Sequence, residues 1–152
     1  MKWSKHIFDE WETVMIRKQI PTAEVKKRVS RASKAFPEAF VRGYESLIPL
    51  LELPDMADRH VLAAAIRYNA DVIVTNNLSD FPNAYLQTFD IRATSPDEFL
   101  ADVVSLKPQR WLEAFEMLVS CKKKPPVTSS AMLNRYRTLG LTETVSELEK
   151  LV

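Results

Sequence analysis

The feature that most constrains the fold is a run of three β-branched residues, Val72-Ile73-Val74, between the polar residues Asp71 and Thr75. A strand with one solvent-facing side would alternate apolar and polar residues. An uninterrupted apolar run is instead typical of a strand that is buried on both faces, as in a parallel sheet. Parallel strands need long crossover connections, which helices usually supply. The run therefore predicts an α/β fold with a short parallel sheet.

Helical patterns precede this run. Apolar residues recur at helical spacing near the start of the chain, at Trp3, Ile7, Trp11, Val14 and Met15. In order along the chain we expect a helix over Trp3–Gln19, a helix over Ala23–Phe36 with Thr22 as its N-cap, a short strand over Phe40–Tyr44, and a helix that begins at Asp55 or Asp58. Helices before and after a buried strand support the α/β class.

A second strand and a clear helix start follow. Asp90–Thr94 predicts another buried strand. Ser95 is expected to be the N-cap of the next helix, with Pro96 at the first helical position and Glu98 completing a capping box. We expect this helix to end near Leu106.

The rest of the chain reads as helices alone. The expected helices are Pro108–Lys123, Ser129–Leu139 and Thr142–Val152, with Gly140 as a stop signal. We therefore expect an α/β domain over residues 1–106 and a helical extension over residues 107–152 that packs on it.

Composition limits the class of protein. A chain of 152 residues with 46% hydrophobic residues can bury one core, and a second full domain is not expected. No apolar run approaches the roughly 18 residues of a membrane span, and no secretory signal is evident at the first residues. The single cysteine, Cys121, favours a reducing compartment, so we expect a cytoplasmic protein. A net charge of +1 leaves any nucleic-acid binding to local patches.

Small polar residues gather where the first buried strand ends, at Thr75, Asn76, Asn77, Ser79 and Asp80. Ligands of open α/β sheets bind at the carboxyl ends of strands. The helix that begins near Asp58 leads into this strand and should run antiparallel to it, so Asp58 and Asp80 are expected at the same edge. Carboxylate and amide oxygens suit Mg²⁺ or Mn²⁺, and no Cys/His spacing supports zinc. Spacing alone leaves another interpretation open, with Asp58 as an N-cap and Asp80 as a turn residue.

Two stretches of sequence resemble a known family. DRHVLAAA (residues 58–65) and ADVIVTNNLSDFP (residues 70–82) resemble the carboxy-terminal half of a PIN domain, in the subgroup that includes VapC-like toxins. Trp3-Ser4 and the segment from Ile7 to Glu10-Trp11 are similar to the part of that family that carries its second acidic residue. The resemblance covers roughly residues 3–106.

The resemblance implies a three-layer α/β/α fold and a metal-dependent endoribonuclease, the toxin of a toxin–antitoxin pair. Carried over to this chain, the catalytic and metal-binding acids are Glu10, Asp58 and Asp80, with Mg²⁺ or Mn²⁺ as the cofactor. Thr75, Asn76 and Asn77 are the polar residues of the same edge. The implied partners are RNA and a cognate antitoxin.

The chain departs from the family pattern at its start. A complete PIN domain begins with a central strand that ends in a metal-ligating Asp, and no such segment precedes Trp3. We therefore expect impaired activity, and a homo- or hetero-oligomer in which another chain supplies the strand. The alternative is a non-catalytic, truncated PIN protein that binds and regulates a partner. A third hypothesis is a nuclease completed in trans by a separate first segment.

The roles of several cationic residues and of one histidine each have two interpretations. Lys26, Lys27 and Arg31 form the basic side of one helix, as an RNA-phosphate contact or as a solvated surface. Arg59 is expected to contact phosphate or to pair with Asp55. His60 could ligate a metal, but we favour a packing or hydrogen-bonding role.

Overall fold

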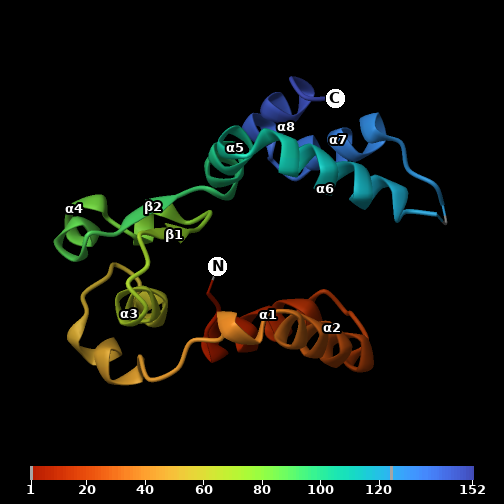
Figure 1. The fold of residues 1–152 in the computed structure, drawn as a ribbon. Helices are drawn as coiled ribbons and strands as arrows, with labels where there is room; N and C mark the ends of the chain where they lie inside the picture. The colour runs from red at the N-terminus through yellow and green to blue at the C-terminus, as the bar shows by residue number, and fades with distance from the viewer. Residues whose placement is uncertain (1, 124) are drawn as a thin grey trace. The chain divides into compact units, whose positions relative to one another are not determined.

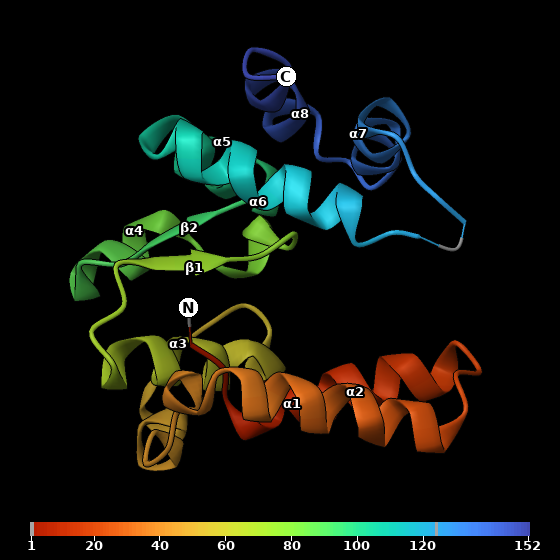
Figure 2. The same ribbon diagram turned by 45° about the vertical axis from the view of Figure 1, so that its right-hand side comes forward.

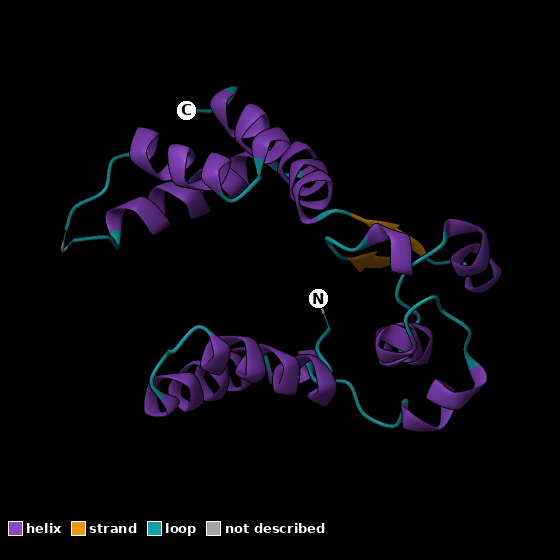
Figure 3. Cartoon of the chain, turned by 180° about the vertical axis from the view of Figure 1, so that it is seen from behind, coloured by secondary structure: helices purple, strands orange, loops and turns teal. Residues whose placement is uncertain are grey.

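The structure, a computed structural model, describes residues 2–123 and 125–152 and is mostly helical, with two short strands (Figure 3). The chain forms two compact units. The first contains Met1–Ile73 and Ser79–Ala93, and the second contains Val74–Leu78 and Thr94–Val152. Among the described residues, no helix combines the length and the apolar character that a membrane crossing requires.

The first unit begins with two contacting helices, α1 (Lys5–Arg17) and α2 (Thr22–Ala35), which lie side by side (Figure 2). The Ser4 hydroxyl caps α1 by accepting a hydrogen bond from the Ile7 N–H at 3.2 Å. Thr22 is the first residue of α2 rather than its cap, because Pro21 takes the N-cap position and makes no side-chain hydrogen bond there.

The apolar pattern of α1 predicts its buried face only in part. Met15 is 4% exposed, whereas Trp11 is 37% and Val14 is 42% exposed. The buried aromatic residue is Phe8, which stacks against Trp3 and Phe40. Helical spacing identifies an apolar stripe, but the neighbours that cover it decide which part is buried.

The core of the first unit is built around α3 (Arg59–Arg67), which follows a 3-10 turn over Met56–Asp58. The small residues of α3 allow close approach of its neighbours, among them the 3-10 helix Glu45–Leu50. A short helix, α4 (Asn83–Leu86), adds a fully buried leucine. The buried residues of this core are Val41, Tyr44, Leu51, Leu53, Leu62, Ala63, Ala64, Ala65, Ile73, Phe81, Leu86 and Ile91.

The two strands, β1 (Val72–Val74) and β2 (Arg92–Thr94), pair in parallel (Figure 1). The Arg92 N–H donates to the Asp71 carbonyl and the Thr75 N–H donates to the Thr94 carbonyl, each at 3.0 Å. A short parallel sheet among helices agrees with the expected PIN-like α/β fold.

The prediction that β1 is buried on both faces is only partly correct. Ile73 is 5% exposed, but Val74 is 42% exposed. A two-stranded sheet gives each strand one neighbour, and β2 is the only strand paired with β1 among the residues that the structure describes. The strand expected over Phe40–Tyr44 is reduced to one parallel bridge between Trp3 and Phe40.

The second unit contains four helices among its described residues: α5 (Pro96–Leu106), α6 (Pro108–Ser120), α7 (Ser129–Thr138) and α8 (Thr142–Glu149). The capping box of Ser95 and Glu98 is confirmed. Gly140 follows α7 with a φ of 83°, a conformation that glycine adopts without steric cost. Six buried residues form its core: Val104, Phe115, Met132, Leu133, Val145 and Leu148.

Asp97 fastens the first helix of this unit to the last. Its carboxylate accepts hydrogen bonds from the N–H groups of Glu143 and Thr144, both at 2.8 Å, and from the hydroxyls of Thr142 and Thr144. Asp97 thus caps α8 from α5. The helix α5 contacts α8 and α6. The domain boundary expected at residue 106 stays a prediction.

Candidate metal centre

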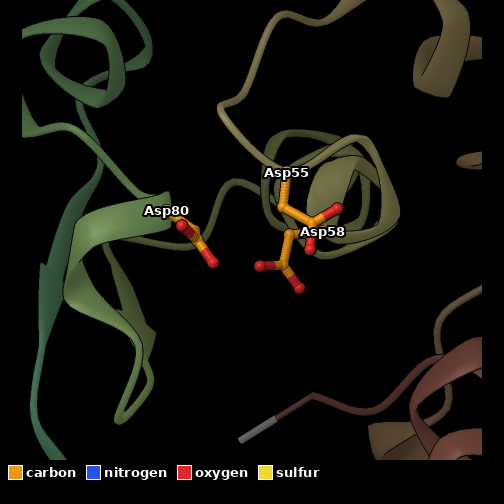
Figure 4. A group of neighbouring side chains, drawn as sticks. All are labelled: Asp55, Asp58 and Asp80. Carbon is orange, nitrogen blue, oxygen red and sulfur yellow. The ribbon is translucent and has the colours of Figure 1, made fainter.

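Three carboxylates of the first unit converge. One oxygen from each of Asp55, Asp58 and Asp80 lies within 4.8 Å of the other two (Figure 4). Asp55 and Asp58 come from the turn before α3, and Asp80 comes from the segment after β1. The convergence of Asp58 and Asp80 that helix–strand geometry predicts is therefore present.

Local structure directs each of these side chains. The Asp55 carboxylate accepts a hydrogen bond from the Ala57 N–H at 2.8 Å, which shapes the turn before α3. Asp58 occupies the N-cap position of α3 but makes no capping hydrogen bond, so the cap interpretation of Asp58 is not what the structure shows. Asp80 ends a 3-10 turn and precedes Phe81, which is 3% exposed and anchors this segment in the core.

The electrostatics of Asp58 indicate a site that favours a cation. Burial raises the pKa of Asp58, and the negative charges of Asp55, Asp80 and Glu10 raise it further, while His60 acts in the opposite direction. Carboxylates gathered without a counter-ion repel one another. A set of oxygen ligands with this much negative charge fits a hard divalent cation such as Mg²⁺ or Mn²⁺.

Glu10 is close to this group without belonging to it. The three-carboxylate cluster does not include Glu10, and the Glu10 carboxylate instead contacts His60 Nε2 at 2.9 Å. Its influence on the pKa of Asp58 nevertheless shows that the two carboxylates are electrostatic neighbours. The role of Glu10 as a ligand stays a prediction. His60 is 5% exposed, so the hydrogen-bonding role favoured for it is confirmed.

Sequence reasoning missed Asp55 as a member of the cluster. Its signal was present, because Asp55 and Asp58 are three residues apart at a helix start, a spacing that brings side chains together. Asp55 was considered only as a helix start or as a partner of Arg59. The structure contains no ion pair between these two residues. The Arg59 Nε atom is buried and has no hydrogen-bond partner among the described residues.

The remaining candidate residues lie at the surface or in a turn. The Asn77 N–H donates to the Thr75 hydroxyl at 3.0 Å, which makes a tight turn after β1. Lys26, Lys27 and Arg31 are exposed on α2. The roles expected for these residues and for Asn76 stay predictions.

Comparison with known proteins decides the family. The PIN domain family matches residues 1–79, slightly more than half of the 152-residue chain. The chain belongs to the PIN domain family. Residues 96–150 of this PIN protein match a second family, described as the VapC50 C-terminal domain.

The chain is also similar to a curated protein. The Mycobacterium tuberculosis (strain ATCC 25618 / H37Rv) protein named "Putative ribonuclease VapC50" is 38% identical over 109 residues. The match covers 69% of this PIN protein and 64% of the relative, so the chain spans less than two thirds of the relative's length. No solved structure matches the chain.

Proposed function

We propose that this protein is a Mg²⁺- or Mn²⁺-dependent endoribonuclease of the PIN type and the toxin of a toxin–antitoxin pair. One observation carries the proposal: Asp55, Asp58 and Asp80 converge in a chain of the PIN family. The similarity to a relative named as a VapC50 ribonuclease supports RNA as the substrate. The single cysteine supports a cytoplasmic location.

In this proposal Asp58 and Asp80 hold the metal ion together with Asp55 and Glu10. A divalent cation in such a site lowers the pKa of bound water and polarises the scissile phosphate. The protein's own contribution is to hold the carboxylates close together. Arg59, which is part-exposed at the start of α3 beside Asp58, would contact an RNA phosphate through the outer part of its guanidinium group. Lys26, Lys27 and Arg31 would extend the phosphate contact.

The test is cleavage of single-stranded RNA by the purified chain with Mn²⁺, compared with an Asp58→Asn variant. We expect the substitution to reduce cleavage at least 100-fold, because it removes a metal ligand. Asp90→Asn is the matched control, since Asp90 is exposed and its φ of 58° suits asparagine. Equal cleavage by wild type and Asp58→Asn contradicts the proposal.

A further strand is proposed to complete the sheet. β1 pairs only with β2 among the described residues, and Val74 at its end is 42% exposed. The Trp3–Phe40 bridge is likewise a single pairing. Open strand edges of this kind accept an added strand. We propose that a preceding segment, the cognate antitoxin or a second copy of the chain supplies it, giving the three-layer fold and a homo- or hetero-oligomer.

The same open edges favour a second candidate function, a non-catalytic PIN protein that binds and regulates a partner. The two candidates differ in one measurement. A metal-dependent cleavage that Asp58→Asn removes supports the nuclease, including one completed in trans by a strand-donating chain. Background cleavage in every variant, with light scattering that shows a stable oligomer, supports the binding protein.

A further inference from the structure

A buried histidine lies next to the candidate metal centre and contacts one of its acids. The His60 side chain is 6% exposed, and its Nε2 atom is 2.9 Å from Oε1 of Glu10, whose side chain is 59% exposed. The other ring nitrogen, Nδ1, is buried and has no hydrogen-bond partner among the described residues. The contact joins α1, which carries Glu10, to the start of α3.

This bonding pattern determines which nitrogen of His60 carries the proton. A carboxylate can only accept hydrogen bonds, so the proton lies on Nε2 and is donated to Glu10. A second proton on Nδ1 would leave a buried N–H group without an acceptor, which is costly. We therefore assign the proton of this contact to Nε2, so the ring is a donor aimed at Glu10.

A second histidine holds the first in place. The rings of His6 and His60 stack, with centroids 4.9 Å apart and planes inclined by 23°. His6 Nδ1 is in turn 2.6 Å from the hydroxyl of Tyr44, which is 1% exposed. His6 and Glu10 are four residues apart on α1 and therefore share a face of this helix.

Glu10 needs such support because its own position is weakly constrained. It is mostly exposed, and a glutamate in water samples many rotamers. The aspartates differ from it, since the Asp55 carboxylate accepts a hydrogen bond from the Ala57 N–H and the segment that carries Asp80 is anchored by the buried Phe81. Within residues 2–123 and 125–152, the contact that restricts the Glu10 carboxylate is the one with His60 Nε2.

We propose that His60 is a positioning residue, which, stacked on His6 and anchored through it to Tyr44, holds the Glu10 carboxylate for metal binding beside Asp58. The inference rests on the proposed metal centre and adds residues to it. His60 does not itself touch the metal; it acts through Glu10. Outer hydrogen bonds of this kind orient ligands and commonly change metal affinity 10- to 100-fold when they are lost.

The test is the affinity of the full chain for Mn²⁺, measured by isothermal titration calorimetry without RNA. His60→Met removes the donor while keeping an apolar side chain, and we expect about tenfold weaker binding. His60→Gln restores an N–H donor of similar reach and is expected to bind within about threefold of wild type. Equal affinity of wild type and His60→Met overturns the proposal.

A double-mutant cycle separates positioning from a general effect on folding. If His60 acts through Glu10, the Glu10→Gln/His60→Met double variant should bind Mn²⁺ no more weakly than Glu10→Gln alone. Additive losses contradict the proposal. Should His60→Met fail to fold, Tyr44→Phe removes only the hydroxyl that anchors His6, and about threefold weaker binding is expected. Unchanged binding by Tyr44→Phe would then count against the anchor.

Two further measurements complete the design. Nitrogen-15 NMR of the metal-free chain should show a proton on His60 Nε2, and its absence overturns the assignment of His60 as the donor to Glu10. Asp58→Asn distinguishes the two levels of the argument. If Asp58→Asn weakens Mn²⁺ binding and His60→Met does not, only the positioning role fails. If Asp58→Asn leaves binding unchanged, the proposed metal centre fails and the positioning role fails with it.

Discussion

Two aspartates at helix starts, Asp58 in the first unit and Asp97 in the second, have opposite environments. Asp97 accepts hydrogen bonds from the backbone and side chains of α8, and these lower its pKa although burial acts to raise it. Asp58 makes no capping bond, and burial together with neighbouring acids raises its pKa. One carboxylate is satisfied by the protein and stabilises the fold. The other lies among like charges that oppose its ionisation.

The same contrast extends to the two units. In the second unit, side chains cap helix starts by accepting hydrogen bonds from backbone N–H groups. Examples are the capping box at Ser95 and the Thr128 cap of α7. The first unit contains both buried side-chain atoms that lack a hydrogen-bond partner among the described residues, Arg59 Nε and His60 Nδ1. Unsatisfied polar groups cost stability, and proteins tolerate them chiefly at functional sites. The comparison supports the first unit as the location of the proposed site and indicates a structural role for the Asp97 network.

The largest expected effect is the loss of the Asp97 network. Asp97→Ala should lower the free energy of unfolding of the second unit by about 3 kcal/mol, because it removes a helix cap and leaves the N–H group of the buried Thr144 without its acceptor. Hydrogen exchange followed by mass spectrometry should show lost protection in α8 and unchanged protection in α3. Unchanged protection in α8 would contradict the stabilising role given to Asp97 in its contrast with Asp58.

A slightly smaller effect is expected from metal binding to the first unit. Mn²⁺ at 100 times its dissociation constant should stabilise the wild-type chain by about 2.7 kcal/mol. Thermal unfolding with and without Mn²⁺ measures this shift. Asp58→Asn should lose most of it, and the Asp90→Asn control should keep it. A full Mn²⁺ shift in Asp58→Asn would show that the ion binds elsewhere.

The charge of Asp97 should make the second unit sensitive to acid. A lowered carboxyl pKa contributes stability above the ordinary value of 3.8, and this contribution is lost as the pH falls through the folded-state pKa. Asp97→Asn keeps one acceptor oxygen and should cost about 1 kcal/mol at pH 7. Urea unfolding from pH 7 to pH 2.5 should show wild type and Asp97→Asn converging at the acid end. A constant difference across this range contradicts the assignment.

The smallest effect has the opposite sign. Without metal, Asp58→Asn should raise the stability of the first unit at pH 7 by about 0.5 kcal/mol, after allowance for solvent screening, because it removes a charge that its neighbours repel. A raised carboxyl pKa means that this penalty is fully present above the folded-state pKa and is lost as the pH falls from there through the ordinary value of 3.8. Metal-free urea unfolding at pH 7 and pH 3 measures the difference. A less stable Asp58→Asn variant at pH 7 would remove the contrast with Asp97.

Local signals were predictable from sequence, and distant contacts were not. The capping box of Ser95 and Glu98 follows from residues three apart, and the meeting of Asp58 and Asp80 follows from the antiparallel packing of a helix and its next strand. The contact between His60 and Glu10 joins residues 50 positions apart, and no periodicity marks it. The bond from Thr144 to Asp97 spans 47 positions.

Burial was the other limit of sequence reasoning. Trp11 and Val14 fit the apolar stripe of α1 and are nevertheless exposed, and Val74 fits a buried strand and is exposed at its end. A residue's own chemistry gives its tendency to be buried, whereas its exposure depends on which segments cover it. The same limit applies to the candidate metal centre. Asp55 is a turn residue in the sequence, and its proximity to Asp80 makes it a possible ligand.

The bond between α5 and α8 closes the helical unit upon itself, since its first helix and its last helix are direct neighbours. The order of the helices along the polypeptide is therefore separable from their order in space. A circularly permuted form of the helical residues 94–152 alone, opened after the exposed Cys121 and joined from α8 to α5, would keep the contact between α5 and α8.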